Sequence, residues 1–200
     1  MPRRVVVAAL GLPVWAPPGV DPERWRDALA EDLLDVLATM AEVEAAVAVP
    51  PGGVDLVRRV GWPGLSAYEL PALDVVSILT AAAADGYDQA AVLAPDIPDL
   101  PGMIIAKLLR PLSSRPVAVA AADGGPGLLG LSAVLPAPAW LPALTLDELT
   151  PQHLRRLAPA QTDVAPAAAW HRLRSPADLG RLDPRLEGWD ATRALLSPRR

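Results

Sequence analysis

Short runs of apolar residues without polar alternation recur through the first 135 residues. The first run, Val5 to Leu10, is rich in β-branched residues and is closed by Gly11 and Pro13, which predicts a buried strand. Further strands are expected in "VEAAVAVP" (43–50), Gln89–Ala94, "PVAVAAADGG" (116–125) and "GLLGLSAVLP" (127–136), the last as a strand or a hairpin arm. Unbroken apolar runs are typical of strands that are buried on both faces of a parallel sheet.

Segments with helical periodicity separate these runs. Asp21 is a suitable N-cap, Pro22 stands at the first helical position, and apolar residues then recur at helical spacing up to Met40. Further helices are expected in "VDLVRRV" (54–60), Asp74–Ala84 and Pro101–Arg110, and "AYELPAL" (67–73) is expected to be a short strand or an extended segment. This alternation predicts an α/β fold, a three-layer sandwich around a parallel or mostly parallel central sheet.

The pattern weakens after Pro136. "TLDELTPQHLRRLAP" (145–159) is expected to hold one helix or two turns, and "SPADLGRLD" (175–183) a short helix that Ser175 caps. The polar C-terminal tail is expected to be flexible. We expect a single domain over residues 1–200, with a regular core in 1–135 and a less regular part in 136–200.

Composition narrows the function classes. Apolar residues make up 52% of the chain and charged residues 20%, which excludes a disordered chain. The net charge of −5, without a basic stripe, argues against a nucleic acid as partner. The absence of cysteine excludes disulfides, thiolate metal sites and cysteine nucleophiles.

The N-terminus superficially resembles a secretory signal, because two arginines precede an apolar run. That run is short, β-branched and followed by prolines, so a first core strand is the preferred interpretation. No stretch approaches the roughly 20 unbroken apolar residues that a membrane helix needs. We therefore expect a cytoplasmic protein without a membrane partner.

Candidate chemistry lies in three loops that follow predicted strands, namely Gly11–Val20, Ala94–Leu100 and Asp123–Gly127. Open α/β sheets bind ligands beyond the carboxyl ends of their strands. Two of these loops carry carboxylates, which suit Mg²⁺ or Mn²⁺ bridging the phosphates of a nucleotide. Pro95 and Pro98 would hold Asp96 in place.

Structural roles compete with these functional ones. Asp99 is a natural cap for the helix that begins near Pro101, Asp96 suits a turn, and "DGG" is a common tight turn. His153 and His171 lack metal-spaced partners and are interpreted as surface or packing residues. Neither a dinucleotide-binding glycine motif, a P-loop nor a serine-hydrolase elbow is present. The occurrence of acids at two separate strand ends favours function.

The stretches "VLAPDIPDLPGMIIAKLL" and "VAVAAADGGPGLLGL" resemble small bacterial GT-A-like transferases, of the radical-SAM/selenodomain-associated or arsenosugar-biosynthesis glycosyltransferase-like type. The resemblance covers about residues 85–135, extends loosely to "RLRSPADLGRL" (172–182), and is more distant to cofactor guanylyltransferases. It implies a nucleotide-diphospho-sugar transferase fold that transfers a glycosyl or nucleotidyl group from a nucleotide-sugar or a nucleoside triphosphate to a small-molecule acceptor.

Individual positions carry implied roles. Asp96 matches the family's metal-proximal acid, and Asp99 matches the second acid of that motif, near the substrate. Asp123 matches the catalytic acid of the acceptor-side turn, together with the substrate-binding glycines Gly124 and Gly125. Gly11, in the first loop, falls in the nucleotide-binding position.

Three departures from the family pattern weaken the metal expectation. The first loop has no basic residue before Arg24, and the tyrosine expected after DGG is Pro126. Arg172 and Arg174 stand where the family has acids, and a fixed positive charge repels Mg²⁺. Arginine at this place is expected either to bind the substrate's diphosphate directly or to mark a catalytically degenerate relative that acts as a ligand- or partner-binding module.

Overall fold

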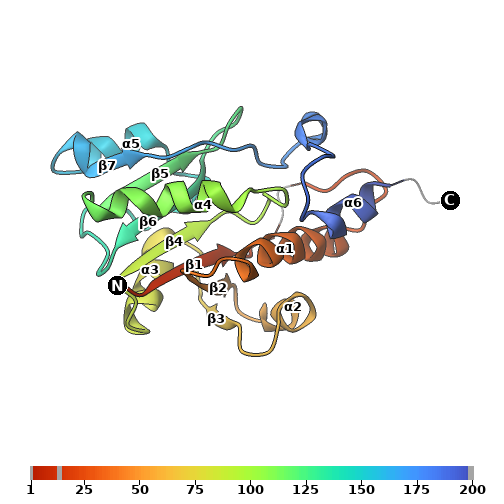
Figure 1. The fold of residues 1–200 in the computed structure, drawn as a ribbon, viewed down its shortest axis with the longest axis horizontal. Coiled ribbons are helices and arrows are strands. Elements are labelled where there is room, and N and C mark those ends of the chain that lie inside the picture. Colours follow the sequence, from red (N-terminus) through yellow and green to blue (C-terminus); the bar gives the residue numbers. More distant parts are fainter. Residues whose placement is uncertain (1, 13–14, 198–200) are drawn as a thin grey trace.

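The structure is a computed structural model that describes residues 2–12 and 15–197. Its strands are β1 (Arg4–Ala9), β2 (Glu44–Val49), β3 (Ser66–Glu69), β4 (Gln89–Leu93), β5 (Val117–Ala121), β6 (Leu128–Val134) and β7 (Val164–Pro166). Its α-helices are α1 (Pro22–Ala38), α2 (Val54–Val60), α3 (Val75–Ala84), α4 (Gly102–Leu109), α5 (Pro151–Leu157) and α6 (Asp190–Leu196). Short 3₁₀ turns are η1 (Arg110–Ser113), η2 (Gln161–Asp163) and η3 (Pro176–Arg181). Figure 1 shows their arrangement.

The described strands form one seven-stranded sheet in the order β3-β2-β1-β4-β6-β5-β7. Every neighbouring pair is parallel except the two that involve β6, which runs antiparallel to β4 and to β5. The connection from β5 to β6 is a short turn through Gly124 and Gly127, and so short a link joins only antiparallel strands. The mostly parallel sheet is thus confirmed, and β6 is the hairpin arm.

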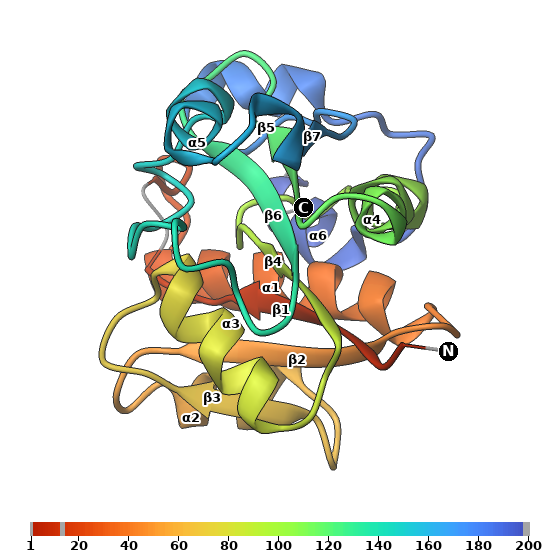
Figure 2. The same cartoon turned by 90° about the vertical axis from the view of Figure 1, so that its left-hand side faces the viewer.

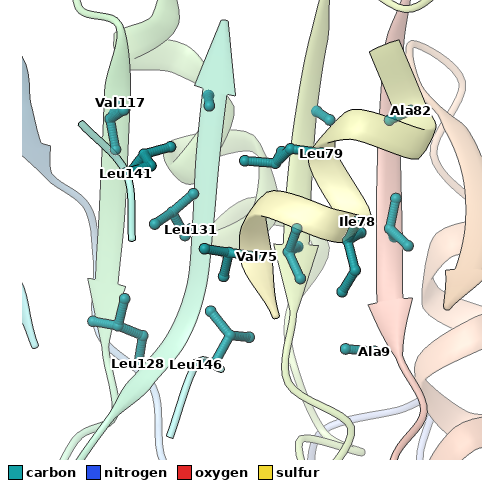
Figure 3. Close-up of a cluster of buried hydrophobic side chains, with 14 of the residues drawn as sticks. Ala9, Val75, Ile78, Leu79, Ala82, Val117, Leu128, Leu131, Leu141 and Leu146 are labelled. Carbon is teal, nitrogen blue, oxygen red and sulfur yellow. The ribbon is translucent and has the colours of Figure 1, made fainter. Parts of the chain in front are cut away.

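Helices cover both faces of the sheet, as Figure 2 shows. In β1, Val5 and Val7 face one side while Val6 and Ala8 face the other, and all four are fully buried. Helices α1, α2 and α4 pack on the second side and α3 and α5 on the first. Figure 3 shows the core beneath α3. This two-sided burial explains why the strand sequences lack polar alternation.

The C-terminal part adds to the core instead of trailing from it. Strand β7 pairs with β5 at the sheet edge, and α6 packs against α1 (Figure 1). Between them, residues 170–174 cross the carboxyl ends of the strands; we call this segment the arginine strap. Its backbone is fixed because Asp123 N donates to Trp170 O at 2.8 Å and Leu173 N donates to Asp96 O at 2.8 Å.

The local predictions after Pro136 have mixed outcomes. The expectation of one helix or two turns in 145–159 is confirmed as one helix, which begins at Pro151. Ser175 precedes η3 but its hydroxyl donates to the Asp178 carboxylate instead of capping the turn. Pro13 and the last three residues of the tail lie outside the described residues. Among the described helices, none has the length and apolarity to cross a bilayer.

Candidate functional site

The candidate site lies at the carboxyl ends of β1 and β4, where the strand order of the sheet reverses. The chain passes from β1 outward to β2 and β3, then returns to place β4 on the other side of β1. Such reversals are where open α/β sheets bind ligands. A cavity of about 220 Å³ opens there.

This first cavity is bordered by both strand ends and by two segments from elsewhere in the chain. Its lining includes Gly11 and Leu12 after β1, Pro95 and Asp96 after β4, and Asp147 and Arg172 from the C-terminal part. Leu12 is 78% exposed at the rim. The structure brings Gly11 and Asp96, both predicted as site residues, into the lining of one cavity.

Asp96 is held at the floor of this cavity by two arginines of the strap. Arg172 Nε donates to Asp96 Oδ1 at 2.5 Å and Arg172 Nη2 to Oδ2 at 3.1 Å, while Arg174 Nε also donates to Oδ2 at 3.2 Å. The Asp96 and Arg172 side chains are both only 4% exposed. Two-point pairing of this kind is the strongest arrangement available to a guanidinium and a carboxylate.

A second carboxylate, Asp147, contacts the same two arginines from the opposite wall. Arg172 Nη1 donates to Asp147 Oδ1 at 2.7 Å, and Arg174 Nη2 donates to the same oxygen. Partial burial would raise the pKa of Asp147, but the two guanidinium charges outweigh it and hold that pKa below its usual value. Asp147 is therefore a carboxylate at neutral pH.

The DGG turn lines a neighbouring cavity of about 200 Å³, which contains Asp123, Gly124, Gly125, Arg172 and Arg174. Gly124 has a φ of +79°, a backbone conformation that favours glycine. Arg181 pairs with Asp123, donating to its carboxylate and, at 2.6 Å, to its carbonyl oxygen. Asp123 is nevertheless 60% exposed, so it remains accessible from this second cavity.

Asp99 does not cap α4, which corrects the capping interpretation. The helix begins without a side-chain cap. The Asp99 carboxylate instead accepts a bond from Trp170 Nε1 at 3.2 Å, and its other oxygen lies 3.1 Å from His171 Nε2. Asp99 is fully buried and lines neither cavity, so its place in the fold is that of an anchor beneath the strap.

Asp96 and Asp123 therefore lie on the same edge of the sheet but line two adjoining cavities, not one cleft. Arg172 borders both cavities and so connects them. Sequence reasoning identified Asp96, Arg172 and Arg174 but not Asp147 or Arg181. Nothing near Asp147 marks it, because its partners lie 25 and 27 residues further along the chain.

Comparison with known proteins adds the fold but no close relative. No family model matches the sequence, and no curated protein matches it. A candidate nucleotide-diphospho-sugar transferase from Desulfovibrio desulfuricans G20 superposes with a TM-score of 0.66 at 19% identity, over 98% of this chain and 97% of that chain. The chain therefore has the nucleotide-diphospho-sugar transferase fold.

Two further structures share this transferase fold. The 4-diphosphocytidyl-2C-methyl-D-erythritol synthase of Anaerococcus prevotii has a TM-score of 0.59 at 10% identity, over 98% of this chain and 97% of its own. A manganese complex of Mycobacterium tuberculosis Rv0371c has a TM-score of 0.58 at 14% identity, over 91% and 98% respectively. Identities this low establish the fold alone, because one fold hosts many activities.

The residues at Asp96 do not fit a divalent metal ion. Mg²⁺ and Mn²⁺ require several free oxygen donors. Both Asp96 oxygens already accept hydrogen bonds from guanidinium groups, and the described residues contain no group of three or more His, Asp or Glu side chains arranged to hold a metal. We therefore assign the positive charge at this site to Arg172 and Arg174.

Proposed function

We propose that the protein is a transferase that binds a nucleotide or nucleotide-sugar in the first cavity and a small-molecule acceptor in the second. The observation that carries this proposal is the position of Arg172, which borders both cavities. A donor whose phosphates lie against Arg172 would present its reacting group toward Asp123 and the DGG turn.

Arginine supplies the charge that this chemistry needs. When a glycosyl or nucleotidyl group is transferred, negative charge grows on the departing phosphate oxygens. Fixed guanidinium groups of Arg172 and Arg174 would stabilise that charge without a metal ion. Asp123 is placed to accept the proton of an attacking acceptor hydroxyl, because its carboxylate is exposed to the second cavity.

Calorimetric titration with CTP, GTP and UDP-, GDP- and dTDP-sugars, each in EDTA and in Mn²⁺, tests the proposal. We expect saturable binding of at least one of these ligands that persists in EDTA. Arg174→Met should weaken that binding at least tenfold, whereas Arg185→Met, which removes an exposed arginine outside both cavities, should not change it. Failure of every ligand to bind, or binding that strictly requires Mn²⁺, would refute the proposal.

A second candidate, a binding module without catalysis, is favoured by one observation. Both acids to which the resemblance assigns chemistry are paired with arginines, Asp96 with Arg172 and Asp123 with Arg181. Turnover separates the two candidates. Product formed from a bound donor, and lost in Asp123→Asn with binding retained, supports the transferase; binding without turnover across acceptor classes supports the module.

A further inference from the structure

The two carboxylates that contact the arginine pair differ sharply in how firmly they are held. Asp96 is 4% exposed, uses both oxygens, and has its backbone carbonyl bonded to Leu173. Asp147 is 45% exposed and contacts both guanidinium groups through one oxygen only. Asp96 is thus held more firmly in the site than Asp147.

Charge balance shows what an exchange would require. Asp96 and Asp147 together carry two negative charges, and Arg172 and Arg174 carry two positive ones. Without the Asp147 carboxylate, Asp96, Arg172 and Arg174 together retain one uncompensated positive charge. The Arg172 side chain is only 4% exposed to water. A buried charge left without a partner is strongly unfavourable, so another anion must replace Asp147 whenever it leaves.

The hydrogen-bond donors around Asp147 suit a phosphate. A guanidinium has five N–H donors. Arg172 uses four, toward Asp96, Leu128 O and Asp147, and Arg174 uses three, toward Asp96, Pro126 O and Asp147. If the Asp147 side chain moves away, each arginine gains one free N–H donor, in addition to the N–H donors that have no partner already. Converging N–H groups from two arginines match the several oxygens of a phosphate.

The backbone beneath Asp147 is fixed, so that the exchange involves the side chain alone. Leu128 N donates to Leu146 O at 2.8 Å, and Thr145 N donates to the Glu148 carboxylate at 2.8 Å. Gly127 has a φ of +85°, and a Cβ atom there would lie 3.1 Å from the Asp147 Cα. The loop therefore rests directly on the turn before β6, and rotation about the Asp147 side-chain bonds suffices to clear the arginines.

We propose that Asp147 is a built-in competitor: its carboxylate occupies the phosphate-binding position of Arg172 and Arg174 in the ligand-free protein and is displaced by a phosphate-bearing ligand. This inference rests on the proposed function only for the identity of the anion. Because binding must first break the Asp147 contacts, the carboxylate lowers the apparent affinity for phosphates.

Titration of inorganic pyrophosphate in EDTA, followed by calorimetry, tests this. We expect Asp147→Asn, which keeps the side-chain shape and removes the charge, to bind pyrophosphate at least tenfold more tightly than the unmodified protein. Asp183→Asn is the matched control, because Asp183 pairs with the exposed Arg185 and lies outside both cavities. Equal or weaker pyrophosphate binding by Asp147→Asn than by the unmodified protein would overturn the inference.

A crystal structure of the unmodified protein with pyrophosphate gives an independent readout should Asp147→Asn fold poorly. We expect pyrophosphate oxygens on both guanidinium groups and the Asp147 carboxylate turned away from them. Pyrophosphate bound elsewhere, or Asp147 still contacting both arginines, would overturn the inference. If nucleotides bind but Asp147→Asn binds pyrophosphate no more tightly than the unmodified protein, only this inference fails. If Asp147→Asn binds pyrophosphate more tightly as expected but no nucleotide binds, only the proposed function fails.

Discussion

The pair formed by Asp96 and Arg172 brings together residues 76 positions apart in the sequence, and both side chains are almost fully removed from water. A carboxylate at this depth is tolerated because each oxygen has a donor. The same burial makes the pair vulnerable, since the loss of either partner leaves the other charged and unsatisfied.

We expect Arg172→Met to lower the free energy of unfolding by about 3–5 kcal/mol, because Asp96 would keep only the contact from Arg174. Urea unfolding at pH 7 measures this change. Arg185→Met is the control: its pair with Asp183 is exposed and should contribute no more than about 1 kcal/mol. A similar small effect from Arg172→Met would show that Asp96 is not held as described.

Sequence reasoning found the residues of the central contact but not that they meet. Asp96 and Arg172 were identified separately, but their bond depends on the path of the strap, which no local pattern encodes. Asp99 was interpreted as a cap because local signals for capping are strong. In the structure Trp170, 71 residues away, provides its partner instead.

Strand β6 packs closely against its neighbours at Gly130. A Cβ atom at Gly130 would lie 2.9 Å from Val92 O and within about 3 Å of the Leu93 and Leu108 side chains. We expect Gly130→Ala to lower the unfolding free energy by about 1–3 kcal/mol through overpacking. Urea denaturation measures it, with Gly180→Ala as the control, because nothing lies within 4 Å of a Cβ there. Equal stabilities would contradict this packing.

A buried acid of α1, Asp32, holds the start of α6. Asp32 is 1% exposed and accepts hydrogen bonds from Ala191 N at 2.9 Å and Thr192 N at 2.8 Å. Burial raises the pKa of Asp32 to about 6, and these hydrogen bonds only partly oppose the shift. The folded protein thus binds this proton more tightly than the unfolded chain, for which the ordinary value is 3.8.

The sign of the pH dependence follows from that difference. Stability contributed by Asp32 is fully present below pH 4 and is lost as pH rises from 4 through 6, by roughly 3 kcal/mol for a shift of about two pKa units. Asp32→Asn should remove this dependence, whereas Asp35→Asn, on the exposed side of the same helix, should retain it. The measurement is the free energy of unfolding of each protein at pH 4, 5, 6 and 7. A difference in that free energy between the unmodified protein and Asp32→Asn that stays constant with pH would contradict this expectation.

Periodicity predicted the strands and helices of the first 135 residues to within a few positions, because burial on both faces leaves a strong hydrophobic signal. It missed β7 and α6 for identifiable reasons. Strand β7 has three residues and ends in Pro166, as only an edge strand tolerates. Helix α6 has no side-chain cap from its own segment. The carboxylate that accepts hydrogen bonds from its first N–H groups belongs to Asp32, 159 and 160 residues before Ala191 and Thr192.

At the scale of the whole molecule, the C-terminal part completes the sheet and closes the candidate site. We expect the full chain to unfold in one transition and a chain ending at residue 135 to lose cooperative folding. That truncation removes β7, the buried core residue Leu149 and both arginine partners of Asp96. Circular dichroism during thermal unfolding distinguishes the two chains. A cooperative transition in the shorter chain at an unchanged midpoint would contradict this expectation and favour two independent units.

Arg172 faces two compartments with a single guanidinium group. Any anion that enters one compartment changes the field that a molecule in the other experiences, and thermodynamic reciprocity requires each occupant to alter the other's affinity by the same factor. Loading of the two compartments therefore cannot be statistically independent. Because both molecules share Arg172, the kinetics would show ordered binding, with the negatively charged molecule first.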